Sequence, residues 1–145
     1  MKTQNIQSKV DEIVSHFAGL NSWEDKYKEI INLGKGLKAM PEELIVDAHK
    51  VKGCQSQVWL FPEMSSPVDN LIFYADSDAL IAKGLVALVL KVCNGSTADE
   101  IVGLTTQFIE DIGLKEHLSP NRSNGILAMF KQIKLYAFAI KMKAQ

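Results

Sequence analysis

The chain has 145 residues, of which 47% are hydrophobic and 23% are charged, and a formal net charge of −1. These values are typical of one globular domain, so we expect residues 1–145 to fold around a core of their own. They exclude a disordered chain, a collagen-like chain and a disulfide scaffold, and they give no reason to expect a nucleic acid or a membrane as partner.

Two amphipathic helices are predicted in the N-terminal third of the chain. Apolar residues recur every three or four positions over residues 6–17, and Gly19 marks the end of this stretch. The second helix is expected to begin at Ser22, in a capping box with Asp25, and to end within residues 34–41.

The middle of the chain lacks helical periodicity and is predicted to form a small sheet. Residues 57–61 and 71–74 are β-prone, and the turn-rich residues 62–70 separate them. We expect these two runs to pair as an antiparallel hairpin. A short strand near residues 49–52 is predicted to add a third strand.

Helices return after the predicted sheet. Residues 79–93 are apolar nearly all round, as expected of a buried central helix, and a capping box of Thr97 with Glu100 begins a stretch that runs to Gly113. A last helix follows residues 119–121. This order predicts an α+β domain in which helices cover one antiparallel sheet of about three strands.

Charge is distributed unevenly, because every Asp and Glu lies at or before Glu116. Residues 121–145 therefore carry basic residues and no acidic ones. We interpret Lys131, Lys134 and Lys141 as a solvated face of the last helix, opposite its apolar stripe, and docking to an acidic partner is the alternative.

A cytoplasmic location is predicted from the sequence. The polar N-terminus lacks the apolar core of a secretory signal, and no apolar run approaches the ~20 residues of a membrane span. The chain has only two cysteines, which suits a reducing compartment.

Cys54 is the candidate reactive residue. It lies between Gly53 and the small polar residues Gln55 and Ser56, where strand gives way to turn, which is an unusual setting for a core side chain. Backbone amides and the two polar side chains would stabilise its thiolate, the reactive form. A buried structural thiol is the alternative. Cys93, at the end of an apolar helix, is predicted to be core packing.

Three more polar residues are candidates for a site. Asp76 and Asp78 are either paired acids or metal ligands, and the alternative is that they cap the helix that follows. Arg122 precedes the last helix in a polar turn, where it is directed into a site or exposed at the surface.

No metal centre is predicted, because the cysteines lie far apart in the chain and the three histidines show no ligand spacing. A hydrolase that pairs Cys54 with His49 or His117 stays open, since such partners need to meet only in space. No other feature of the sequence supports that hydrolase.

Four blocks of sequence closely resemble the SufE family of sulfur-acceptor proteins. In the family's order they are WEDKY with IINLG (residues 23–27 and 30–34), VKGCQSQVWL (residues 51–60), DSDA with KGLVA (residues 76–79 and 83–87) and HLSPNRSNG (residues 117–125). The similarity extends from about residue 10 to residue 137. The chain departs from the family at Lys38, where proline is common, which affects the shape of a loop rather than the chemistry.

The resemblance implies a role in sulfur transfer. Members of the family partner a pyridoxal-phosphate-dependent cysteine desulfurase, accept persulfide sulfur on one cysteine, stimulate the desulfurase and pass the sulfur to iron–sulfur cluster assembly. Cys54 occupies the acceptor position, in a turn expected to be mobile and to shelter the persulfide. The residues expected to support it are Gly53, Gln55, Ser56, Asp76, Asp78 and Arg122.

The resemblance also implies fold, cofactors and partners. The family fold is similar to that of iron–sulfur scaffold proteins, but this chain lacks the three cysteines that would hold a cluster. No cofactor is expected, because the pyridoxal phosphate belongs to the partner desulfurase, and the chain is not expected to be a stand-alone enzyme. An iron–sulfur scaffold complex is the second expected partner, and a homodimer is left open.

Two other functions are left open at this point. A cluster or metal scaffold would carry iron or zinc, which the small number of ligand residues opposes. A non-covalent binding module would activate the desulfurase without accepting sulfur.

Overall fold

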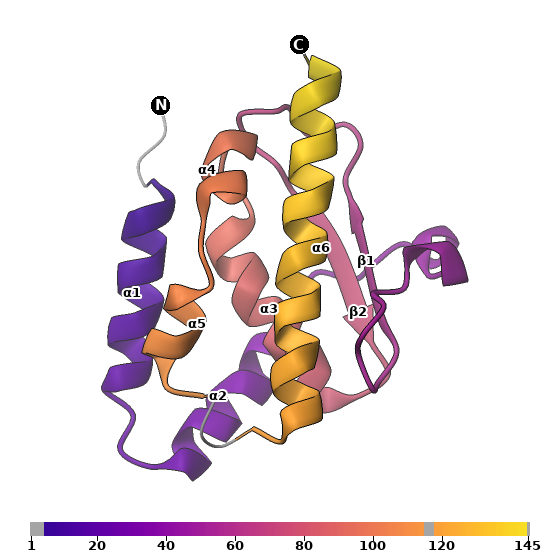
Figure 1. Cartoon of the computed structure of the whole chain (residues 1–145). Coiled ribbons are helices and arrows are strands. Elements are labelled where there is room, and N and C mark those ends of the chain that lie inside the picture. The colour runs from indigo at the N-terminus through magenta and orange to yellow at the C-terminus, as the bar shows by residue number, and fades with distance from the viewer. Residues whose placement is uncertain (1–4, 115–117, 145) are drawn as a thin grey trace.

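This computed structural model describes residues 5–114 and 118–144. They form two strands, six α-helices and two short 3-10 helices, joined by loops (Figure 1). In chain order the elements are α1 (Ile6–Ala18), α2 (Trp23–Lys35), η1 (Glu42–Leu44), η2 (Asp47–His49), β1 (Val58–Pro62), β2 (Phe73–Ser77), α3 (Leu80–Cys93), α4 (Ala98–Gly103), α5 (Gln107–Ile112) and α6 (Pro120–Ala144). Helices precede and follow the strands, so the predicted α+β class is confirmed.

The sheet has two antiparallel strands rather than the predicted three. Strand β1 pairs with β2 so that Val58 lies opposite Ser77. The expected strand at residues 49–52 is reduced to one bridge between Lys50 and Trp59. A 3-10 turn precedes this bridge and a sharp turn at Gly53 follows it, so too few residues are extended to form a strand.

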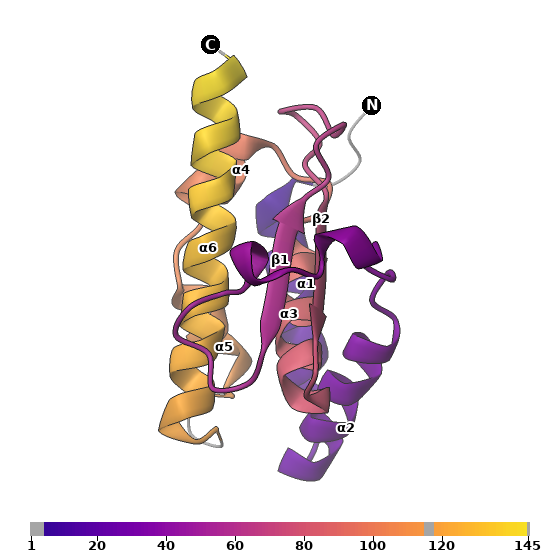
Figure 2. The ribbon, with the colours of Figure 1, turned by 90° about the vertical axis from the view of Figure 1, so that its right-hand side faces the viewer.

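Helices α3 and α6 contact the sheet, α3 beside β2 and α6 beside β1 (Figures 1 and 2). The hydroxyl of Tyr136 on α6 donates a hydrogen bond to the Leu60 carbonyl on β1 at 3.1 Å. Helices α1 and α2 pack on α3, and α4 packs on α6. Helix α3 is therefore central, as its apolar sequence predicts.

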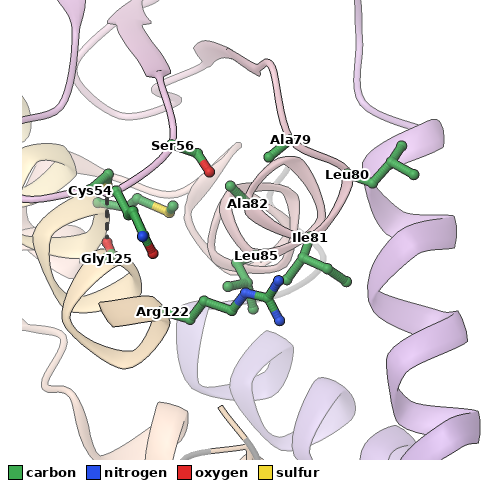
Figure 3. Close-up of a pocket in the computed structure, with 11 residues that line it drawn as sticks. Cys54, Ser56, Ala79, Leu80, Ile81, Ala82, Leu85, Arg122 and Gly125 are labelled. Carbon is green, nitrogen blue, oxygen red and sulfur yellow. Dashed lines mark hydrogen bonds between the residues drawn. The ribbon is translucent and has the colours of Figure 1, made fainter. Parts of the chain in front are cut away.

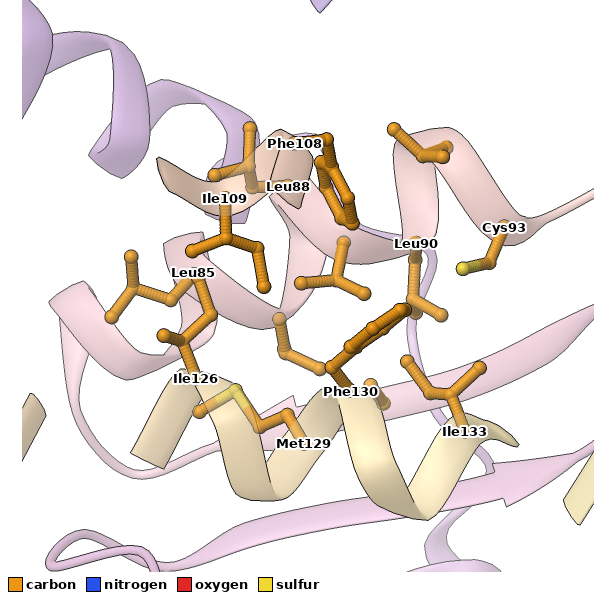
Figure 4. Packing of buried hydrophobic residues seen from close by; sticks show 14 of the residues in the cluster. Leu85, Leu88, Leu90, Cys93, Phe108, Ile109, Ile126, Met129, Phe130 and Ile133 are labelled. Carbon is orange, nitrogen blue, oxygen red and sulfur yellow. The ribbon is translucent and has the colours of Figure 1, made fainter. Parts of the chain in front are cut away.

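Much of the core lies between α3, α5 and α6 (Figure 4), and the same cluster extends to α1, α4 and both strands. Phe108 and Phe130 meet edge to face in it, with ring centroids 5.6 Å apart. Full burial of one such side chain contributes about 1.5–3 kcal/mol. On the other side of α3, Gly84 permits a close crossing with α2, because a Cβ there would lie 2.2 Å from the Ile30 carbonyl oxygen.

The predicted starts of α2 and α4 are confirmed, whereas α6 begins at Pro120, so Arg122 lies in its first turn and not in a turn before the helix. The Ser22 side chain accepts a hydrogen bond from the Asp25 amide, and Thr97 and Glu100 form a reciprocal capping box. Glu100 also accepts a hydrogen bond from the amide of Ile6 at 3.0 Å, which joins the starts of α1 and α4. The helical stretch predicted up to Gly113 consists of two short helices, α4 and α5.

Lys131 is exposed, as its spacing predicts, but Lys134 and Lys141 do not belong to a solvated face. The Lys134 ammonium donates to the Leu104 carbonyl at 2.7 Å, and Lys141 forms an ion pair with Asp99 at 2.7 Å. Both contacts hold α6 against the segment around α4. Within residues 5–114 and 118–144, every helix is too short or too polar to span a bilayer.

Candidate functional site around Cys54

The turn that carries Cys54 is built around Gly53, between the Lys50 bridge and strand β1. Gly53 has φ +96°, in the left-handed region that favours glycine. A Cβ at this position would also lie 3.3 Å from the Cβ of Ala128 on α6. The turn is therefore packed against the first turns of α6, and its left-handed backbone angle explains why a glycine precedes Cys54.

The Cys54 thiol is half-buried and points at α6. Its Sγ donates a hydrogen bond to the carbonyl oxygen of Gly125, with a donor–acceptor distance of 3.5 Å (Figure 3). A Cβ at Gly125 would lie 3.7 Å from Sγ, an ordinary van der Waals distance, so the thiol and this turn of α6 are in direct contact. The contact joins two segments far apart in the chain.

Burial raises the pKa of the Cys54 thiol above its ordinary value. A carbonyl oxygen accepts a hydrogen bond from a thiol and offers none to a thiolate, so this contact also favours the protonated form. The prediction that amides and the Gln55 and Ser56 side chains stabilise a thiolate is therefore wrong for this geometry. Cys54 is held here as a neutral, sheltered thiol.

Cys54 lies at the wall of a pocket of about 320 Å³, between the turn and the first turns of α3 and α6 (Figure 3). Its lining residues are Cys54, Gln55, Ser56, Ala79, Leu80, Ile81, Ala82, Leu85, Arg122, Gly125 and Met129. Most of the α3 wall is apolar. Arg122 extends from α6 toward this wall and supplies a permanent positive charge beside the thiol pocket.

Asp78 stabilises the turn through hydrogen bonds to Gln57 and does not line the pocket. Its two carboxylate oxygens accept hydrogen bonds from the backbone amide and the side-chain amide of Gln57, both at 3.1 Å. The Ser77 hydroxyl donates to the Gln57 carbonyl at 2.7 Å. Three hydrogen bonds thus fix the backbone amide, the carbonyl and the side chain of Gln57, at the point where the Cys54 turn leads into β1.

Asp76 also lies outside the pocket. Its carboxylate accepts from the Ser77 amide at 2.8 Å and forms an ion pair with Lys83 at 3.4 Å. The start of α3 at Ala79 has no side-chain cap of the usual kind, and the Ala79 amide donates to the Ser77 hydroxyl instead. The alternative prediction that Asp76 and Asp78 cap α3 is therefore wrong.

The structure thus brings four of the predicted residues together at one pocket: Cys54, Gln55, Ser56 and Arg122. Sequence reasoning did not single out the apolar wall formed by Ile81, Leu85 and Met129. Helical periodicity marks these residues as buried, but it gives no sign that the starts of α3 and α6 converge on Cys54. Gln57 was also missed, although it belongs to the same block of sequence as Cys54.

The histidines give no support to a hydrolase. His49 donates from Nδ1 to the Leu44 carbonyl at 2.8 Å and stacks on Phe61, away from the Cys54 pocket. His117 lies outside the described residues. Within the described part of the chain, no three His, Cys, Asp or Glu side chains come together as metal ligands.

The sequence matches one protein family over most of its length. The family model described as SufE, an Fe-S metabolism associated domain, matches residues 11–137. A SufE-like protein of Rhizobium meliloti (strain 1021), described as uncharacterized, is 43% identical over 128 residues, which cover 86% of this chain and 91% of the relative. A SufE-like protein of Synechocystis, also described as uncharacterized, is 36% identical over 142 residues, covering 98% and 88% of the two chains.

A solved structure shows the same fold. The solution structure of a hypothetical protein from Thermus thermophilus superposes with a TM-score of 0.78, covering 92% of this chain and 96% of that one. The two sequences are only 16% identical, so this likeness concerns the fold alone. It confirms the arrangement of helices on a small antiparallel sheet.

Proposed function

Because the chain belongs to the SufE family, whose domain is associated with iron–sulfur metabolism, we propose that it is a sulfur acceptor that works with a cysteine desulfurase. Cys54 takes the terminal sulfur from the persulfide of a pyridoxal-phosphate-dependent desulfurase and passes it on to iron–sulfur cluster assembly. The chain stimulates the desulfurase by removing its product and is not an enzyme by itself. The observation that carries the proposal is the Cys54 thiol on a glycine turn beside a pocket with one apolar wall and one arginine.

The transfer is an exchange at sulfur that needs no external oxidant. Cys54 loses its proton, and its thiolate attacks the outer sulfur of the partner's persulfide. A new sulfur–sulfur bond forms to Cys54 while the bond within the partner's persulfide breaks. The partner's cysteine leaves as a thiolate and takes up a proton, so the atoms, charge and oxidation level balance.

The geometry around Cys54 supports a sheltered resting state. The raised pKa and the hydrogen bond to Gly125 keep the thiol unreactive until a partner moves the turn. Such a movement would break one weak hydrogen bond and hydrate the thiol, which lowers its pKa toward the ordinary value. The apolar wall around Leu85 would keep water from the persulfide if the turn returns after transfer.

The test is intact-mass spectrometry after incubation with a cysteine desulfurase, pyridoxal phosphate and free cysteine. We expect a gain of one sulfur atom that a reductant removes. The Cys54→Ser variant should show no gain, and the matched Cys93→Ala variant should gain sulfur like the wild type.

A parallel assay of desulfurase turnover distinguishes the alternatives. The Cys54→Ser variant should fail to stimulate turnover while keeping its fold. Full stimulation by this variant, without any gain of mass, would replace the sulfur carrier by a non-covalent activating module. Sulfur gained at a residue other than Cys54 would contradict the assignment of the site.

A further inference from the structure

Helix α6 is apolar on its outer side as well as on the side that faces the core. Four large apolar side chains on that outer side have exposed fractions between 41% and 52%. With the lysine that lies among them, they form what we call the α6 outer stripe: Leu127, Lys131, Leu135, Phe138 and Met142. Steps of three and four residues place all five on one face of the helix, which is opposite the buried Ile133.

The α6 outer stripe is separate from the Cys54 pocket. Helix α6 runs along the edge of the molecule (Figure 2), and the Cys54 contact with Gly125 is near its start. At 1.5 Å per residue, Leu135 lies about 15 Å and Met142 about 25 Å farther along the helix. A molecule bound at the centre of the stripe would leave the Cys54 turn uncovered.

The spacing within the stripe is that of a seam between two helices. From Lys131 to Met142 the steps are four, three and four residues, the alternation that places successive side chains against one partner helix. A lone exposed apolar residue is ordinary, but a row of four on one helix is typical of an interaction surface. The row extends for about 22 Å, which matches roughly four turns of a second helix.

Lys131 determines the charge of the partner. It is exposed and forms no ion pair among the described residues, whereas Lys134 and Lys141 already bind groups near α4. A helix laid along the stripe would cover the Lys131 ammonium, which is costly unless a carboxylate meets it. The partner helix therefore needs an acidic residue at that level.

A second copy of α6 does not meet this requirement. Residues 121–145 contain no Asp or Glu, so two copies packed through their stripes would bring basic helices together and leave Lys131 without a carboxylate. A bilayer surface fits less well too, because Lys134 binds the Leu104 carbonyl and Lys141 binds Asp99, so neither is free to meet lipid headgroups. We propose that the α6 outer stripe is the docking seam for an acidic amphipathic helix of another protein.

The test uses two synthetic helical peptides of about 20 residues. Both carry leucine along one face, and glutamate flanks that face in the first peptide and lysine in the second. Binding is measured by titration calorimetry at physiological salt, and amide chemical shifts of the protein locate the site. We expect the glutamate peptide to bind at least 10-fold tighter than the lysine peptide and to shift resonances along α6.

Three variants make the test specific. The double variant Leu135→Gln with Phe138→Gln should weaken binding of the glutamate peptide at least 10-fold, and it should fold normally because both side chains are half-exposed. Lys131→Glu should reverse the preference between the two peptides. The matched control is Val46→Gln, which changes a side chain that is 40% exposed and lies between η1 and η2, and it should leave binding unchanged.

A different binding partner at the α6 outer stripe would give a different result in these experiments, and each of the following results would overturn the proposal. Equal affinity for the two peptides, or no binding of either, would show that Lys131 does not select an acidic helix. Sedimentation as a dimer that the double variant abolishes would assign the stripe to a second copy. Binding to vesicles with anionic lipids, lost in the double variant, would assign it to a membrane surface.

Discussion

The two cysteines of this chain lie in contrasting regions of the fold. Cys54 is half-buried on a turn beside a pocket, whereas Cys93 is 0% exposed at the end of the central helix α3. Burial raises the pKa of both thiols, that of Cys93 from 9.0 to about 12. A depressed pKa therefore does not distinguish the candidate reactive cysteine. What distinguishes Cys54 is a turn that holds it at the surface.

The largest expected contrast between these regions is in chemical labelling. Iodoacetamide should alkylate Cys54 in the native protein at least ~1000-fold faster than Cys93, because Cys93 becomes accessible only when the core opens. Peptide mapping by mass spectrometry measures both rates in one sample. In urea the two rates should become similar, which is the internal control. Comparable rates in the native state would mean that the end of α3 opens easily.

The next largest expected effect of the buried Cys93 thiol is on the free energy of unfolding at alkaline pH. Between pH 9 and 12 the native state retains the Cys93 proton that the unfolded chain releases. The free energy of unfolding should therefore fall by about 1.4 kcal/mol per pH unit from this thiol alone, with no effect below pH 9. Urea unfolding of the wild type and of Cys93→Ala should show this difference in slope. Equal slopes for the two proteins would contradict the burial of Cys93.

The helices were predictable because their signals are local. The capping residues Ser22 and Thr97 lie within three positions of the groups they bind. The third strand was not predictable, since its loss depends on the backbone of η2 and of Gly53 rather than on β-propensity. The lysines of α6 show the same limit, because Asp99 and the Leu104 carbonyl are distant in the chain.

One part of the candidate site could likewise be predicted from the sequence, and another part could not. Gly53, Cys54, Gln55 and Ser56 are consecutive, so the sequence placed them together, and Arg122 was a candidate because of the polar residues around it. The acceptor for the Cys54 thiol is a backbone carbonyl 71 residues away, and no side chain marks it. The protonated state of Cys54 follows from this tertiary contact and could not be derived from the polar neighbours in sequence.

The smallest expected effect concerns the turn itself and is tested by Gly53→Ala. Alanine at φ +96° is strained, and its Cβ would press on Ala128 at 3.3 Å, so we expect a loss of about 1–2 kcal/mol in the free energy of urea unfolding. The displaced turn should also loosen the hydrogen bond to Gly125 and speed the alkylation of Cys54.

Gly36→Ala is the matched control for that loss. Gly36 has φ −84°, and a Cβ there would lie at an ordinary 3.6 Å from the Leu33 carbonyl, so the change should stay within about 0.5 kcal/mol. If both variants lose the same small amount of stability, the turn has shifted to relieve the backbone strain and the contact with Ala128, which would show that the turn moves easily. A loss well above about 2 kcal/mol would instead mean that the turn is packed rigidly against α6, and access to the Cys54 thiol would then require opening of that contact.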